Sequence, residues 1–484
     1  MYYIGLDVGT SSLKTTLIDE DKKIVYETSH PYAFDEPFEG YREIDPDIWF
    51  QSVLQSLSSI FAQYDEKDIA CIGVTGQMHT TVFLDDEGSA VRKAIMWNDL
   101  RSAYMVETLR EELSKLEETR HIANILSPGN PAINTLWVKE HEPNVFTKIR
   151  KIMSAYDYIV FRLTGAYSAD YCDASTSSLY DIASKKWSKY MFDKLGISED
   201  YVGPIHASCD VVGTLLESLC EQLHTHAIAV IAGTGDNPAN AVALGLLHKR
   251  DPVISLGTSG VVIMPKADND FEGKGKNVLF NACHEKFVNV VQGTVRSAGG
   301  THKWWIENII ESKDMSVDQT RIDKCQLGKH NVLFFPHITG DKLIYKDIET
   351  RGAYVGLSAN TKREDMLQAL FEGVSYAIRE VLENMNLSSW PKLIQINGGG
   401  TKSAIWMHIM ANVLHTRLEV VTTQASPGYG VSLLARMVDK QGEDEEITSM
   451  CGDIYVPEED IIQAYHMQYE KYKRMYQALK QITQ

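Results

Sequence analysis

The sequence predicts an α/β protein built from two similar halves. A β-rich run, a Gly-Thr-Ser turn and a second β-rich run occur at residues 2–18 and again at residues 253–264. A unit that recurs about half a chain apart indicates a duplicated fold. Between and after the two copies, strand-like apolar runs alternate with helix-like segments, which is typical of α/β proteins. The length of 484 residues suits two or more domains.

In the first half, the hydrophobic pattern predicts strands at residues 2–7, 13–18, 69–74 and 228–232. The first two form a hairpin whose bend is residues 9–12. The last strand ends at a glycine-containing turn. Pro238 then suits the first turn of a helix that continues to Leu247.

In the second half, we expect strands at residues 253–256, 261–264 and 393–396. A helix is predicted from about residue 401 to 414, and the glycine turn at residues 426–430 opens another. A short polar stretch at residues 248–252 separates the halves, so we place the domains at 1–247 and 248–484.

Composition excludes several classes of protein. Lys plus Arg is 47 and Asp plus Glu is 65, which gives a formal charge of 47 − 65 = −18. So acidic a surface repels phosphate backbones, and neither nucleic acid nor an anionic membrane is expected as a partner. We see no signal peptide and no apolar run of the ~18 residues that a membrane span needs, so we expect a cytoplasmic protein. The seven scattered cysteines are expected to be buried, reduced thiols.

Three glycine-rich turns could bind phosphate: residues 9–12, 257–260 and 398–400. Such turns point backbone N–H groups and hydroxyls at anions. A single turn is weak evidence, because plain hairpin turns look alike, but the pair at equivalent places favours phosphate binding. There is no GxxxxGK[ST] motif, and Pro238 takes the place of the third glycine of a dinucleotide fingerprint.

Two carboxylates, Asp7 and Asp236, stand where strands end beside these turns. Each alone would more often be a turn or cap residue. Beside phosphate turns, such a carboxylate can hold hydrated Mg²⁺ or accept a proton from a hydroxyl group. The combination predicts phosphoryl transfer.

Polar and aromatic residues after two neighbouring strands could bind a polyhydroxylated ligand. They are residues 77–79 and residues 97–101, the latter containing Trp97, Asn98, Asp99 and Arg101. Alone, His79 and Trp97 would more often be structural.

Taken together, these motifs resemble the FGGY carbohydrate kinases, and within them most closely the xylulokinases. The resemblance runs nearly end to end, in order and in spacing. Residues 3–11 and 255–260 resemble the family's two phosphate motifs, and residues 76–79 and 97–101 its substrate motifs. The other matches are the segment of the catalytic aspartate, the adenosine motif and the C-terminal signature: residues 235–237, residues 397–400 with Ser403, and residues 352–357 with 371–373.

The resemblance implies two actin-like, ribonuclease-H-like domains with a duplicated βββαβαβα core, which close over a sugar and MgATP in a central cleft. It implies ATP-dependent transfer of the γ-phosphate to the terminal hydroxyl of a ketopentose, first of all D-xylulose. By analogy Asp236 is the general base, and Asp7 supports Mg²⁺ through water. Sugar contacts are then expected from Met78, His79, Trp97, Asn98, Asp99 and Asn237. Phosphate and nucleotide contacts are expected from Thr10, Ser11, Lys14, Gly257, Thr258, Ser259, Gly299, Gly399, Gly400 and Ser403. A homodimer is an expectation at the level of the family.

Some positions depart from the family pattern: Thr80, Asn134, Pro238 and the loop at residues 335–342. They leave the transfer machinery intact and keep the sugar open. Ribulose, L-xylulose or a polyol such as glycerol is the alternative to D-xylulose. A non-catalytic, actin-like module that responds to nucleotide or sugar is a further alternative, which the presence of Asp236 disfavours, and a phosphatase of the same fold is a weaker one.

Overall fold

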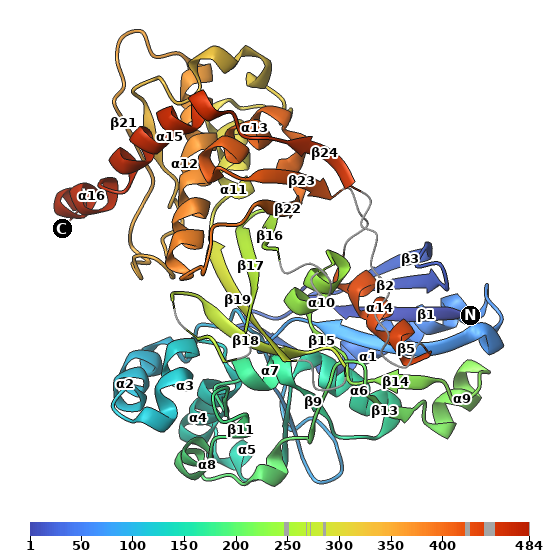
Figure 1. The fold of residues 1–484 in the computed structure, drawn as a ribbon. Coiled ribbons are helices and arrows are strands. Elements are labelled where there is room, and N and C mark those ends of the chain that lie inside the picture. Colours follow the sequence, from blue (N-terminus) through green and yellow to red (C-terminus); the bar gives the residue numbers. More distant parts are fainter. Residues whose placement is uncertain are drawn as a thin grey trace.

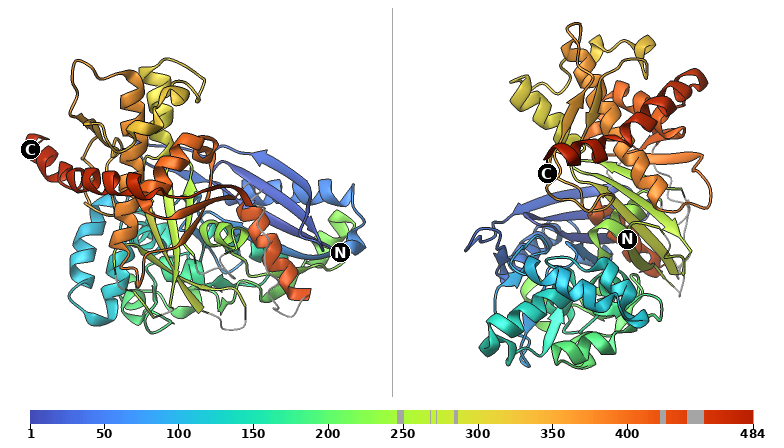
Figure 2. Two further views of the ribbon diagram at one scale, coloured as in Figure 1. Left: turned by 45° about the horizontal axis from the view of Figure 1, so that its top comes forward. Right: turned by 90° about the vertical axis from the view of Figure 1, so that its left-hand side faces the viewer.

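A computed structural model describes residues 1–245, 251–267, 269–271, 273–283, 287–421, 426–439 and 451–483. The chain forms two α/β domains, each built around one large sheet (Figure 1). Further views show strands of the second domain reaching toward the first (Figure 2). Within the described residues, no helix is long and apolar enough to cross a membrane.

The sheet of the N-terminal domain mixes parallel and antiparallel neighbours. Strand β1 (Tyr2–Val8) runs antiparallel to β2 (Ser12–Asp19) and parallel to β5 (Ile69–Gly76), as expected for a hairpin followed by a crossover. In order across the sheet, the strands are β13 (Val211–Thr214), β14 (Ala229–Ile231), β5 (Ile69–Gly76), β1 (Tyr2–Val8), β2 (Ser12–Asp19) and β3 (Ile24–Pro31), with β15 (Thr234–Gly235) paired to the end of β5.

The sheet of the C-terminal domain repeats this plan. Its strands, in order from one edge to the other, are β24 (Cys451–Tyr455), β23 (Arg417–Val421), β22 (Leu393–Asn397), β16 (Val253–Leu256), β17 (Gly260–Lys266), β19 (Phe287–Val295) and β18 (Lys276–Asn281). From β24 to β19, every neighbour is parallel or antiparallel as its counterpart is between β13 and β3. The predicted duplication is confirmed, and β18 is the one strand added to it in the described part of the chain.

Helices cover both sheets, and in the N-terminal domain a further group of helices lies beside the sheet (Figure 1). Helix α1 shows the usual reason: its buried residues Trp49, Val53, Leu57 and Ile60 recur at helical spacing and face the sheet. The helices of the N-terminal domain are α1 (Pro46–Phe61), α2 (Ala103–Leu113), α3 (Arg120–Ile125), α4 (Pro131–His141), α5 (Pro143–Phe146), α6 (Ala155–Thr164), α7 (Tyr171–Thr176), α8 (Lys189–Leu195), α9 (Glu217–Leu223) and α10 (Asp236–Ala243).

The second half of the chain adds longer helices, of which α12 is buried along most of its length. They are α11 (Gly299–Trp304), α12 (Arg363–Asn384), α13 (Ala404–Leu414), α14 (Pro427–Asp439), α15 (Glu459–Tyr472) and α16 (Met475–Thr483). Short strand pairs complete the fold: β4 (Glu43–Ile44) with β7 (Ala94–Ile95), β6 (Val82–Leu84) with β8 (Lys151–Met153), β9 (Ala169–Asp170) with β12 (Ile205–His206), β10 (Tyr180–Asp181) with β11 (Lys186–Trp187), and β20 (Leu333–Phe335) with β21 (Ala353–Val355).

Helix α14 packs against the other domain, across β1, β5 and α10 (Figure 1). Backbones touch where it crosses α10, because a Cβ atom on Gly430 would lie 1.7 Å from the carbonyl oxygen of Ala239. The same holds against β1, where a Cβ on Gly5 would lie 1.9 Å from the carbonyl oxygen of Gly428. The predicted glycine turn at residues 426–430 therefore opens a helix whose glycines permit close packing between the domains.

Three predictions need correction. The helix expected from residue 401 begins at Ala404, because residues 399–402 form a 3₁₀ turn and Ser403 caps the helix. The helix expected from Pro238 to Leu247 begins at Asp236 and ends earlier, at Ala243, with Leu244 as its C-cap, whereas the predicted domain boundary at 247/248 lies outside the described residues. The cysteines are not all buried, reduced thiols, since Cys325 is exposed and Cys209 and Cys283 form a disulfide between the domains, with their Cα atoms 5.5 Å apart.

Candidate active site

Three strand ends converge at one edge of the N-terminal sheet. Asp7 on β1 lies opposite Thr75 on β5, and Gly235 on β15 lies opposite Gly76. Residues 77–79 follow β5 directly, and Asp236 follows β15. Because parallel strands end at the same edge, the two predicted carboxylates and the predicted sugar motif are brought together.

Burial and mutual repulsion govern the two carboxylates. Burial raises the pKa of Asp7 to about 7; the neighbouring Asp236 raises it further, and Lys14 opposes the shift. Burial likewise raises the pKa of Asp236 to about 6, while the N–H of Asn237, at 2.8 Å from Oδ1, opposes the shift. Asp236 is thus poised near neutral pH, where a general base is most effective.

The donor set also fits a hydrated divalent cation. Two adjacent carboxylates repel one another, and a cation beside Asp7 would relieve that repulsion. Among the described residues, no group of three or more acidic, histidine or cysteine side chains is arranged to hold a metal ion. A magnesium ion here would therefore take most of its ligands from water and nucleotide phosphates.

The first glycine turn is held rigidly beside the carboxylates. The N–H of Gly9 donates to the carbonyl oxygens of Asp7 and Ser12, at 3.0 and 3.1 Å. Thr10 accepts a hydrogen bond from the indole N–H of Trp97 at 3.1 Å, and the side chain of Ser11 is exposed. Lys14 lies directly across the hairpin from Asp7. The turn therefore connects the predicted phosphate residues to the predicted sugar residues.

The second turn, residues 257–260, rests on the start of α11. The carbonyl oxygens of Gly257 and Thr258 accept the N–H groups of Gly299 and Gly300, each at 2.9 Å. A Cβ on Gly299 would lie 2.4 Å from the Gly257 oxygen, so this contact requires glycine.

The third turn lies against the second. A Cβ on Gly398, which has φ of +102°, would lie 2.6 Å from the carbonyl oxygen of Leu256, the residue that precedes Gly257. Gly399 faces open space, and Gly400 packs on Leu256. Ser403 caps α13 and donates to Gln319 at 2.7 Å. The predicted nucleotide residues of the C-terminal domain are thus gathered around the end of β16.

Met78 lies against Gly235 and Asn237, the residues on either side of Asp236. The Asn237 amide lies 3.9 Å from the Met78 sulfur, and a side chain on Gly235 would collide with Met78. His79 is buried, with φ of +70°, a conformation uncommon for residues other than glycine and characteristic of functional sites. Its backbone N–H donates to Asp173 at 3.3 Å.

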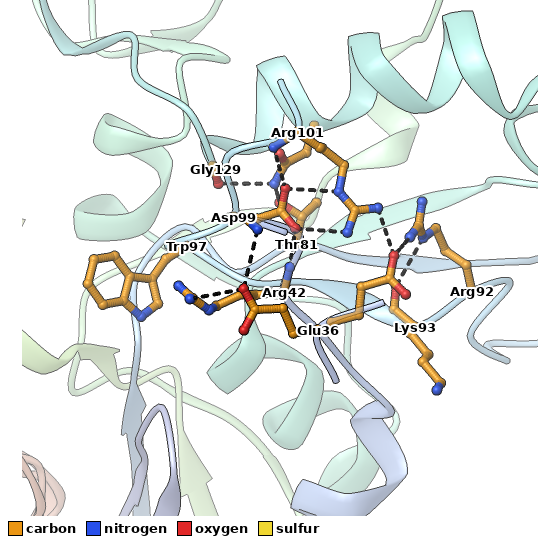
Figure 3. Close-up of polar contacts among 12 residues, drawn as sticks. Glu36, Arg42, Thr81, Arg92, Lys93, Trp97, Asp99, Arg101 and Gly129 are labelled. Atoms are coloured by element: carbon orange, nitrogen blue, oxygen red, sulfur yellow. Dashed lines mark hydrogen bonds and ion pairs between the residues drawn. The ribbon is translucent and has the colours of Figure 1, made fainter. Parts of the chain in front are cut away.

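Asp99 has another set of contacts than predicted. Its carboxylate accepts both Nε and Nη2 of Arg101, at 2.9 and 2.8 Å, and the backbone N–H of Arg42 at 2.5 Å (Figure 3). The side chain is fully buried in this network, so its contacts support a role in holding the loop rather than in touching the sugar. Trp97 points away from Arg101 in Figure 3 and is 44% exposed, and Asn98 keeps a buried side-chain oxygen without a partner.

Two departures from the family pattern have structural explanations. The hydroxyl of Thr80 accepts the backbone N–H of Trp97 at 3.1 Å, which ties the two sugar motifs together. The amide of Asn134 donates to Thr81 and to the carbonyl oxygen of Gly129, at 2.9 and 3.0 Å.

Sequence reasoning missed two charged residues at this site. Asp173, on α7, is buried and receives the backbone N–H of His79. Lys276, the first residue of β18, donates a hydrogen bond to Nε2 of His79. Neither stands in a recognisable motif, because each reaches the site only through the packing of distant segments.

Comparisons with known proteins agree with this geometry. Models for the N-terminal and C-terminal domains of the FGGY family of carbohydrate kinases match residues 2–243 and 253–438. A xylulose kinase of Staphylococcus xylosus is 31% identical over 441 residues, or 90% of each chain. A xylulose kinase of Bacillus subtilis is 29% identical and covers 100% of this chain and 98% of its own.

Other relatives broaden the comparison. The crystal structure of a xyloylose kinase from Brucella ovis superposes with a TM-score of 0.89 at 26% identity, covering 100% of both chains. A gluconokinase of Bacillus subtilis is 23% identical and covers 96% of this chain and 93% of its own. Because the two family models match most of the chain in the expected order, the protein belongs to the FGGY family of carbohydrate kinases, which transfer phosphate to an alcohol group.

Proposed function

We propose that the protein phosphorylates a ketopentose at its terminal hydroxyl, with MgATP as donor and D-xylulose as the preferred sugar. The observation that carries the proposal is the position of Asp236, a desolvated carboxylate with a pKa of about 6: its charge acts on Asp7 at the end of β1, and the neighbouring Asn237 amide lies 3.9 Å from the Met78 sulfur. A carboxylate at this position can accept the proton of the sugar hydroxyl while the hydroxyl oxygen attacks the phosphate.

In the proposed reaction, Asp236 accepts the proton of the sugar hydroxyl as its oxygen attacks the γ-phosphate of ATP. The bond between the γ-phosphorus and the bridging oxygen of ADP then breaks, and ADP leaves. Thr10 and Ser11 from one domain and Thr258 and Ser259 from the other donate to the phosphates. Magnesium, when bound beside Asp7, neutralises charge on the phosphate oxygens.

Nucleotide binding is assigned to the C-terminal turns. Gly399 leaves room beside the end of β16, Gly400 packs closely on Leu256, and Ser403 is fixed as the cap of α13. Small residues allow the adenosine to approach the backbone closely. This assignment follows from the resemblance and from the open space next to Gly399.

The choice of D-xylulose rests on the relatives named xylulose kinase and on the sugar motifs at residues 76–79 and 97–101. The gluconokinase relative and the ammonium group of Lys276 beside His79 together favour gluconate as the second candidate, because an ammonium group can bind a carboxylate.

A panel assay tests the sugar. ADP release is measured with MgATP and D-xylulose, L-xylulose, D-ribulose, L-ribulose, glycerol or gluconate. We expect the highest kcat/KM with D-xylulose. A higher value with gluconate would keep the mechanism and replace the sugar, whereas no turnover with any member would contradict the proposed kinase.

Asp236→Asn tests the base. Because the amide cannot accept the proton, we expect kcat to fall by roughly 10²–10⁴-fold, the usual contribution of general base catalysis. Sugar binding, measured by calorimetry, should stay within a few-fold of the wild type. Turnover within a few-fold of the wild type would contradict the assignment.

A further inference from the structure

The strand that the C-terminal sheet adds to the shared plan, β18, lies on the other domain. It pairs with β19 in its own sheet, and it packs against α7 of the N-terminal domain (Figure 1). Its residue Leu279 donates a backbone hydrogen bond to the Ser175 hydroxyl at 3.0 Å. At its end, the carbonyl oxygens of Asn281, the last residue of the strand, and of Ala282, the next residue, accept the N–H groups of Ser208 and Cys209, each at 2.9 Å. A segment of one domain is thus bonded along its length to the other.

Lys276 begins this strand and reaches the sugar residues. Its ammonium group donates to Nε2 of His79, and its charge acts on both Asp173 and Asp236. The residue is half-buried, and burial lowers the pKa of its ammonium group to about 8, so the group is still mostly charged at neutral pH. The C-terminal domain therefore places a cation among the sugar residues of the N-terminal domain.

The ammonium group also fixes the protonation of His79. A lysine ammonium has only donors, so Nε2 of His79 is the acceptor and the ring is neutral. The ring interacts on its other side with the backbone carbonyl of Thr176, and burial together with Lys276 holds the pKa of His79 well below its usual range. Because Nε2 of His79 already accepts a hydrogen bond from Lys276, it cannot donate one to a sugar. The lysine can, because its ammonium group has further N–H groups.

We propose that Lys276 is a substrate-contacting residue, which donates a hydrogen bond to an acceptor oxygen of the sugar and completes the sugar site when β18 lies against α7. The inference rests on the proposed function and adds to it a contribution from the opposite domain. Carbonyl, hydroxyl and carboxylate oxygens are all suitable acceptors, so the interaction serves a ketose and a sugar acid alike.

The test uses the sugar with the highest kcat/KM in the panel. In Lys276→Met we expect the KM for this sugar to rise roughly 10- to 100-fold, the range for losing a hydrogen bond to a charged group, while the KM for ATP stays within twofold. Lys276→Arg, which keeps the charge, should lie between Lys276→Met and the wild type. A sugar KM within twofold of the wild type in Lys276→Met would overturn the proposal.

Lys274→Met is the matched control. This lysine lies two residues away but donates to the carbonyl oxygen of Ile344 at 2.9 Å, within its own domain. Both KM values should remain within twofold of the wild type. If wild-type protein phosphorylates no sugar, the proposed function has failed, whereas active wild type with unaffected Lys276→Met refutes this inference alone.

A measurement on the wild type guards against variants that do not fold. Acetylation of lysines by an N-hydroxysuccinimide ester is followed by mass spectrometry with and without saturating sugar. We expect the sugar to reduce acetylation of Lys276 several-fold and to leave Lys274 unchanged. Equal acetylation of Lys276 with and without the sugar would overturn the proposal.

Discussion

The two domains share one sheet plan, and they differ in what has been added to it. In the N-terminal domain, the chain between β5 and β14 runs from residue 77 to 228 and contains helices α2 to α9. The equivalent connection in the C-terminal domain, between β22 and β23, contains only a 3₁₀ turn and α13. The C-terminal domain instead adds the strand β18 at the edge of its sheet.

The shared and the added parts have different roles. The shared hairpins provide the two turns that we propose bind phosphate, one in each domain. The added parts meet each other, because β18 packs on α7 within the long insertion of the N-terminal domain. The comparison teaches that duplication accounts for both turns proposed to bind phosphate, whereas Met78 and His79 lie in the insertion of one domain and Lys276 lies on the added strand of the other.

The largest expected effect concerns the stability of the insertion. Arg101→Met removes the partner of the fully buried Asp99, and an unpaired buried charge costs about 3–5 kcal/mol. Urea unfolding should show this loss in the free energy of unfolding. Lys93→Met breaks an exposed ion pair with Asp35, which water and salt screen, and should cost far less. Equal losses in the two variants would show that the Asp99 network does not anchor the insertion.

A pH profile separates the buried carboxylates of the two domains. The kcat/KM for sugar should fall about tenfold per pH unit below pH 6, because Asp236, with its pKa of about 6, can accept a proton only when it is ionised. Burial raises the pKa of Glu380 in the C-terminal domain to about 7, and its carboxylate accepts a hydrogen bond from the hydroxyl of Tyr345, a residue not assigned to the site, at 2.7 Å.

Glu380→Gln is therefore the control for this profile and should leave its acidic limb in place. The raised pKa of Glu380 means that its protonated form is favoured in the folded state, so its contribution to stability is lost as the pH rises toward 7. A limb that moved in Glu380→Gln would contradict the assignment of the limb to Asp236.

The smallest expected effect distinguishes the two phosphate turns. Thr10 contacts Trp97, so Thr10→Val should raise the KM values for both ATP and sugar, by roughly 3- to 10-fold. Thr258 has no such contact among the described hydrogen bonds, and Thr258→Val should raise only the KM for ATP. Steady-state kinetics with each substrate varied in turn measures the difference; identical changes in both variants would remove the functional distinction between the turns.

Much of this fold was predictable from the sequence, because its strands are short apolar runs that end at glycine turns. The hairpins around residues 9–12 and 257–260 show this, as does the position of Asp236 after a strand. Asp99 was harder to interpret, because the neighbouring sequence does not indicate that its carboxylate accepts hydrogen bonds from Arg101 and from the backbone N–H of Arg42.

Contacts between distant segments could not be predicted from local patterns. Lys276 lies in the polar sequence Gly-Lys-Gly-Lys, which has the composition of a surface loop. Its function depends on β18 crossing to α7, a tertiary arrangement that no periodicity encodes. The pairing of Cys209 with Cys283 likewise depends on the position of the same hairpin.

That disulfide restricts how the two domains can move relative to one another. It joins residues 74 positions apart and closes a covalent ring that includes α10 and strands from both sheets. The turn after β18 is consequently fastened to the N-terminal domain whatever the state of the noncovalent contacts. In the oxidised protein, the domains can move relative to one another only by rotating about the disulfide or by bending the β18–β19 hairpin. Lys276 lies seven residues before Cys283, so in such a rotation it moves less than the parts of the C-terminal domain that lie far from the disulfide.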